Sequence, residues 1–167
     1  MGAAKTDSAP QRNPTTVDRK SDRELVVTRR VNAPARMVFE AWTTPALMER
    51  WWVPKSFGIT LLSCEIDART GGSYRFVFAV PNSDQTMAFF GKYTEVIPNA
   101  RLVWTNEESA EGQVSSLTLE EKGGVTLVTL HELYPSKEAL DEAIASGSNG
   151  AWPEQFDELD VLLANCA

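Results

Sequence analysis

A histidine beside a carboxylate could form a general acid–base pair, and the chain has one histidine, His131, followed by Glu132. The alternation of apolar and polar residues around them predicts a β-strand, in which neighbouring side chains point to opposite faces. These two groups therefore cannot easily meet, and we interpret His131 as a structural or solvated residue. The sequence predicts no catalytic residue at this position.

Further carboxylates could serve as a general acid or base, since an enzyme can raise the pKa of a buried carboxyl group. Exposed acidic side chains are nevertheless the usual expectation in a chain of net charge −7. None of the candidates stands in a motif that would single it out. They are Glu49, Glu65, Asp67 and Glu95.

The two cysteines, Cys64 and Cys166, are too few for a disulfide framework. Together with His131 they do not supply the roughly four nitrogen or sulfur ligands of a structural zinc site. Because Cys64 stands among apolar residues, we interpret it as a structural thiol. No glycine-rich phosphate loop opens a helix, and no signal peptide or membrane span is present. We therefore expect a cytoplasmic protein without metal or cofactor.

Composition limits the partners and the number of domains. The 16 basic residues are outnumbered by 23 acidic ones, which argues against nucleic acid as a partner. A chain of 167 residues fits one domain. Residues 1–22 contain almost no large apolar side chain, so we expect a disordered N-terminal tail and a single domain over 23–167.

Periodicity predicts the elements of this domain. A run rich in β-branched residues at 24–31 predicts a strand, and apolar residues at helical spacing predict two short helices after it, at 35–42 and 47–52. Six strand-like runs with short connections then follow from residue 57, which suits an antiparallel meander. With the first strand, the expected sheet has seven strands.

A long C-terminal helix is the element that can cover the apolar face of this sheet. Its apolar stripe is formed by Trp152, Phe156, Leu159 and Leu163. The acidic residues at 154, 157, 158 and 160 are expected to lie mostly away from that stripe. A shorter helix, capped by Ser136, is expected before it, with 146–150 as a flexible joint. The sequence thus predicts an α+β fold in which a curved antiparallel sheet wraps around the C-terminal helix.

This order of elements resembles the helix-grip fold of the START-like (SRPBCC, Bet v 1-like) superfamily. Local motifs resemble more narrowly the Activator of Hsp90 ATPase homologue 1-like (AHSA1-like) family, and they cover the chain from residue 23 onward in the family's order. The motifs are Ala33-Pro34-Ala35-Arg36-Met37-Val38-Phe39-Glu40-Ala41-Trp42-Thr43, Leu47 with Trp51-Trp52-Val53-Pro54, Gly71-Gly72-Ser73-Tyr74-Arg75-Phe76, Gly91-Lys92-Tyr93-Thr94-Glu95-Val96 with Pro98 and Leu102-Val103-Trp104-Thr105, and Asp157-Glu158-Leu159 with Leu162-Leu163.

The resemblance implies a small hydrophobic ligand, bound in a cavity between sheet and C-terminal helix. Two alternatives stay open: a protein-interaction module acting on a chaperone or another protein, and a cyclase-like or dehydratase-like enzyme. If a ligand is bound, even spacing along each strand predicts which residues form the walls of the cavity. Trp51 or Trp52 is expected at its mouth. The predicted ligand-binding residues are Trp51, Trp52, Tyr74, Phe76, Phe78, Phe89, Tyr93, Trp104, Trp152 and Phe156.

Overall fold

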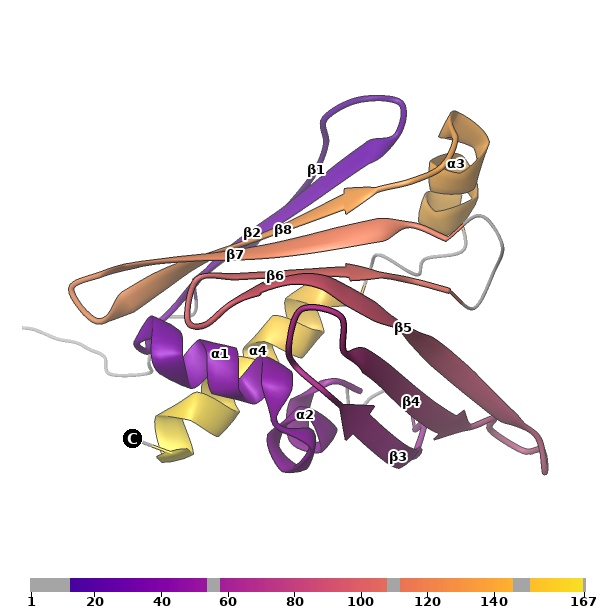
Figure 1. The fold of residues 1–167 in the computed structure, drawn as a ribbon, viewed down its shortest axis with the longest axis horizontal. Coiled ribbons are helices and arrows are strands. Elements are labelled where there is room, and N and C mark those ends of the chain that lie inside the picture. The colour runs from indigo at the N-terminus through magenta and orange to yellow at the C-terminus, as the bar shows by residue number, and fades with distance from the viewer. Residues whose placement is uncertain (1–12, 54–57, 108–111, 146–150, 167) are drawn as a thin grey trace, which may run out of the picture.

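One antiparallel sheet dominates the computed structural model, which describes residues 13–53, 58–107, 112–145 and 151–166. Within these residues it has eight strands in the order β1-β2-β8-β7-β6-β5-β4-β3 (Figure 1). From β3 to β8, each strand lies beside the next one in sequence, so the expected meander is confirmed. The strands are β1 Thr15–Arg19, β2 Glu24–Val31, β3 Leu61–Ile66, β4 Ser73–Ala79, β5 Thr86–Ile97, β6 Arg101–Thr105, β7 Val114–Lys122 and β8 Val125–Leu133.

Three of the helices that the structure describes lie on the same side of this sheet: α1, α2 and α4 (Figure 1). Pro45 opens α2, where its missing N–H costs nothing. The hydroxyl of Ser136 caps α3 by accepting the N–H of Ala139 at 3.1 Å. The α+β helix-grip fold is confirmed. The helices are α1 Ala35–Thr43, α2 Pro45–Trp51, α3 Lys137–Ala145 and α4 Trp152–Cys166.

The first strand, β1, is the main departure from the expected fold. It pairs with β2 from Thr15↔Arg29 to Arg19↔Leu25, so the expectation of disorder is wrong for this segment, and the sheet has eight strands rather than seven. An edge strand is held largely by backbone hydrogen bonds, which leave little trace in side-chain composition. The expected tail over residues 1–12 and the expected joint at 146–150 lie outside the described residues.

Deleting residues 1–22 is therefore expected to lower the melting temperature relative to a deletion of 1–12. The longer deletion removes β1, exposes the edge of β2 and takes Thr15 away from Arg29, with which it is hydrogen bonded. For a chain of this size, each kcal/mol lost lowers the midpoint by about 2–4 °C. Thermal unfolding followed by circular dichroism measures the difference. Equal midpoints for the two deletions would show that β1 does not contribute to stability.

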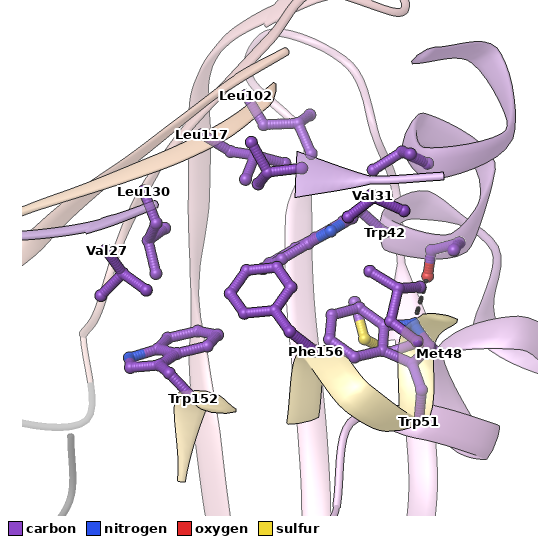
Figure 2. Packing of buried hydrophobic residues seen from close by; sticks show 14 of the residues in the cluster. Val27, Val31, Trp42, Met48, Trp51, Leu102, Leu117, Leu130, Trp152 and Phe156 are labelled. Atoms are coloured by element: carbon purple, nitrogen blue, oxygen red, sulfur yellow. Dashed lines mark hydrogen bonds between the residues drawn. The ribbon is translucent and has the colours of Figure 1, made fainter. Parts of the chain in front are cut away.

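The core lies between the sheet and α1, α2 and α4. The predicted stripe of α4 is buried along its whole length, with Phe156 and Leu159 fully inaccessible. Figure 2 shows Phe156 among side chains from the sheet, including Leu117 and Leu130, and side chains from the helices. Such burial is the main source of the helix's stability, because an isolated helix of 15 residues is marginal in water.

A buried arginine also holds α4 against the sheet. Arg29 occupies an inward position of β2, in phase with Val27 and Val31. Its Nη2 atom donates to Asp157 at 2.9 Å and also to Asp160. Asp157 and Asp160 thus bind a guanidinium that comes from another element, and this contact could not be inferred from the helix alone.

Candidate functional site

A cavity of about 340 Å³ lies between the sheet and the helices. Ligand-binding pockets usually measure about 300–1,000 Å³, so this one is large enough for a small organic molecule. Its walls come from β4 to β8, from α1 and α2, and from the start of α4. The described residues that line it are Trp42, Met48, Trp52, Tyr74, Phe76, Phe89, Tyr93, Leu102, Trp104, Asn106, Gln113, Ser115, Glu132, Tyr134 and Trp152.

The register of the sheet brings four of these residues into one row. Tyr93 pairs with Trp104, Trp104 with Ser115, and Ser115 with Glu132. Residues paired across antiparallel strands share a face, so all four side chains point toward the helices. On one side of this row the strands continue into the apolar core. On the other side β6, β7 and β8 end, and Asn106, Gln113 and Tyr134 lie just beyond these strand ends.

Hydrogen bonds join the polar residues at this end of the cavity. Gln113 Nε2 donates to Glu132 Oε2 at 2.9 Å, and the Tyr134 hydroxyl lies 3.4 Å from Glu132 Oε1. Asn106 Nδ2 donates to the Gln113 carbonyl at 3.0 Å and to Ser115 Oγ at 3.3 Å. Three strand ends are thus linked by side chains, and the Glu132 carboxylate is held in one orientation.

Two tyrosines add hydroxyl groups to the aromatic lining. The Tyr74 hydroxyl donates to the Thr105 carbonyl at 2.7 Å. Its ring fits beside Gly91, where a Cβ atom would lie only 1.9 Å from that same carbonyl oxygen, so any larger residue would force the strands apart. Burial raises the pKa of Tyr93 well above its ordinary value. Tyr93 therefore keeps its proton at neutral pH and can donate a hydrogen bond.

Tryptophans from the helices and from β6 form another part of the lining. The Trp42 ring is the centre of this group, and its centroid lies 5.7 Å from that of Trp52, 5.8 Å from Trp104 and 6.3 Å from Trp152. These residues come from α1, the end of α2, β6 and α4. Since each ring is packed against another, the wall is fixed by the fold rather than formed by one flexible side chain.

Seven of the ten predicted ligand-binding residues line this cavity, and their role in binding stays a prediction. Even spacing along β4 and β5 identified most of them. They are Trp52, Tyr74, Phe76, Phe89, Tyr93, Trp104 and Trp152.

The other three predicted residues, Trp51, Phe78 and Phe156, lie in the core instead. Successive helical residues point about 100° apart, so when Trp52 faces the cavity, Trp51 cannot. The Trp51 indole donates to the Ala41 carbonyl at 2.9 Å (dashed line in Figure 2). Phe78 lies farther along β4 and packs edge-on against Phe89. Phe156 is one turn beyond Trp152 and fully buried.

Sequence reasoning missed Glu132 as a residue of the cavity. Its position was readable from the alternation, because it is in phase with the buried Val128 and Leu130 on β8. His131 points to the other face, where its Nε2 lies 2.8 Å from Glu24 Oε1. That hydrogen bond is the main cause of the lowered pKa of Glu24. Glu132 is thus placed with cavity residues rather than with the histidine beside it.

The remaining candidates for chemistry lie away from the cavity lining. Among the carboxylates, Glu49 and Glu65 are exposed, Asp67 pairs with Arg69, and Glu95 pairs with an arginine of β6. Cys64 is half-buried, and desolvation, with a smaller contribution from Glu49, raises its pKa to about 12. Since the thiolate is the nucleophile, Cys64 is unreactive at neutral pH.

In the part of the chain that the structure describes, no three side chains of histidine, cysteine, aspartate or glutamate are grouped to bind a metal ion. No helix in the same residues is both long and apolar enough to cross a membrane.

Solved structures with the same architecture come from several bacteria. A Rhodobacter sphaeroides protein has 25% identity and a TM-score of 0.83, with 92% of this chain and 99% of that one covered. A Mycobacterium smegmatis protein has 23% identity and a TM-score of 0.77, with coverage of 92% and 100%. An AHSA1-like protein from Aeromonas hydrophila has 18% identity and a TM-score of 0.62, with coverage of 82% and 94%.

Sequence comparison gives the family. No curated protein matches the chain. The family model for Activator of Hsp90 ATPase homolog 1-like proteins matches residues 32–164. This range contains both helices after β2, the strands from β3 to β8 and nearly all of α4, and so all fifteen described residues of the cavity lining. The chain belongs to the Activator of Hsp90 ATPase homolog 1-like family.

Proposed function

We propose that this protein binds a small, mainly hydrophobic molecule in the cavity between the sheet and the C-terminal helix. The observation that supports the proposal is the 340 Å³ of unfilled space lined largely by aromatic rings. The cavity is partly open to solvent, so a small molecule has a route into it. Its size and its mainly apolar lining are those of sites that bind small organic molecules.

The polar groups of the cavity fit this function as well. Binding pockets usually combine apolar walls with a few fixed polar groups that orient the ligand. Here the fixed groups are the hydrogen-bonded side chains of Asn106, Gln113 and Glu132 near the strand ends. A molecule with an apolar body and one polar group would match both parts of the lining.

Titration with 4-phenylbutanol, a neutral molecule with an apolar body, tests the proposal. At about 0.3–0.5 kcal/mol for each of its roughly 11 non-hydrogen atoms, its Kd should lie between about 0.1 and 5 mM. The expected result is saturable movement of the indole ¹H–¹⁵N resonances of Trp52, Trp104 and Trp152, which line the cavity. If these resonances do not move at millimolar concentrations while the protein is folded, the proposal is overturned.

A matched pair of substitutions tests whether the ligand binds in the cavity. Ser115→Leu adds a larger side chain to the middle of the lining and should abolish these shifts. Ser116→Leu makes the same change one residue later, on the opposite face of β7, and should leave them intact. Melting temperatures show whether both variants fold, since overpacking can cost about 1–3 kcal/mol. If both variants bind alike, the ligand lies elsewhere.

A further inference from the structure

The hydroxyl of Tyr93 differs from those of the other two tyrosines in the cavity lining. Tyr93 is only 4% exposed, yet within the described residues its hydroxyl makes no hydrogen bond with another group of the protein. The Tyr74 hydroxyl, by contrast, donates to the Thr105 carbonyl at 2.7 Å. That of Tyr134 lies 3.4 Å from Glu132 Oε1. Since a buried tyrosine hydroxyl usually has a partner, Tyr93 leaves a hydrogen-bonding position open.

The position of Tyr93 directs this hydroxyl into the space between the sheet and the helices. Tyr93 belongs to the row of paired residues that face the helices, and Trp104 lies beside it in that row. The hydroxyl oxygen is the atom of the side chain farthest from the backbone. The ring is packed against the ring of Tyr74, with centroids 5.7 Å apart. A ligand in the cavity therefore meets a hydroxyl whose position is set by the fold.

This hydroxyl is available as a hydrogen-bond donor. Burial raises the pKa of Tyr93, so the group keeps its proton at neutral pH. Trp152, another lining residue and only 7% exposed, likewise carries an indole N–H without an acceptor among the described residues. A ligand that displaces water from such groups loses affinity if it cannot replace the hydrogen bonds of that water. Both groups therefore favour a ligand that brings an acceptor.

A neutral carbonyl oxygen is the acceptor that fits this place. An ionised acceptor would have to leave water for a mainly apolar lining, and such a transfer is costly unless the charge is paired. A hydroxyl group could also accept, but its own proton would then need a further acceptor. A carbonyl oxygen has two lone pairs and no proton, so one donor from the protein satisfies it.

We infer that the ligand of the cavity carries a neutral carbonyl group whose oxygen accepts a hydrogen bond from the Tyr93 hydroxyl. Its apolar body lies against the lining rings of Trp52, Phe76 and Trp152, which pack against one another. Tyr93 is thus the residue that selects carbonyl compounds. This inference rests on the proposed function, since it specifies the class of molecule that the same cavity takes.

Two bicyclic probes of similar size test the inference: 1-indanone, whose carbonyl group only accepts hydrogen bonds, and indole, whose N–H only donates. With about ten non-hydrogen atoms each, both should have a Kd between about 0.2 and 6 mM. The full-length protein is titrated with each probe, and the affinity is measured from the indole ¹H–¹⁵N resonances of Trp52, Trp104 and Trp152, which line the cavity.

Tyr93→Phe is the decisive variant, because it removes the hydroxyl and keeps the ring. It should weaken the binding of 1-indanone by about three- to tenfold, the value of one hydrogen bond, and change the affinity for indole by less than about twofold. Thr94→Val removes a hydroxyl from the next residue, which is exposed, and should leave both affinities unchanged. Melting temperatures show whether the two variants fold.

The outcomes separate this inference from the proposed function. If Tyr93→Phe weakens neither probe, or both alike, the inference is overturned, whereas binding of a hydrophobic molecule stands. The same holds if the protein binds 4-phenylbutanol but not 1-indanone. If none of the three molecules binds, the proposed function fails, and the inference with it.

A second measurement decides the inference if Tyr93→Phe does not fold. Nuclear Overhauser contacts between 1-indanone and the unaltered protein give the orientation of the bound probe. The methylene group beside the carbonyl should lie near the Tyr93 ring. A probe whose carbonyl end points away from Tyr93 would overturn the inference.

Discussion

Replacing both Asp157 and Asp160 by alanine should lower the free energy of unfolding by about 3–5 kcal/mol, the usual cost of breaking a buried ion pair from one side. The Arg29 side chain is 1% exposed, and both carboxylates accept hydrogen bonds from its guanidinium. Without them, the charge on Arg29 stays buried and loses its two acidic partners on α4. Urea unfolding followed by circular dichroism measures the loss.

Two further variants test this explanation. Glu138→Ala removes an exposed carboxylate of α3 and should change the free energy of unfolding by less than about 0.5 kcal/mol. Adding Arg29→Met to the double variant should restore most of the lost stability, because an apolar residue in place of a whole buried ion pair is often neutral or stabilising. A triple variant as unstable as the double one would contradict the buried-charge explanation.

The ion pair also has a consequence for the cavity. Asp157 and Asp160 belong to the helix whose first residue, Trp152, lines the cavity and packs against the rings of Trp42 and Trp52. A helix held at Arg29 therefore keeps Trp152 against the other aromatic rings. We infer that the attachment of α4 to β2 supports the shape of the cavity at a distance, without Arg29 lining it.

Those parts of the fold that depend on side-chain periodicity could be predicted from the sequence. Alternation in Tyr74, Phe76 and Phe78 identifies β4 and its inner face, and the stripe beginning at Trp152 identifies α4. Strand β1 could not be predicted in this way, because only pairing with β2 orders its mixed side chains. Periodicity reports burial, whereas an edge strand depends on backbone partners.

The aromatic part of the site was predictable for the same reason, whereas its polar part was not. Even spacing placed Phe89 and Tyr93 on one face of β5, but no local pattern shows which residues face each other on different strands. Asn106, Gln113 and Tyr134 meet only because the register aligns three strand ends. Trp51 and Trp52 are likewise adjacent at the end of a short helix, and the sequence does not show which of the two faces the cavity.

Phe156→Ala should destabilise the protein by about 3–5 kcal/mol, because the site cannot close around the vacated space. Phe156 is fully buried and packs against the Trp152 ring, with centroids 5.8 Å apart, while core residues of the sheet face it (Figure 2). Val161→Ala on the same helix removes apolar atoms from a residue that is 59% exposed and should cost less than about 0.5 kcal/mol. Urea unfolding of both variants compares the two faces of α4 directly.

Because Phe156 supports Trp152, the alanine variant should also bind 4-phenylbutanol more weakly, although Phe156 does not line the cavity. Equal losses of stability at the two positions would mean that α4 does not face the sheet with its predicted stripe.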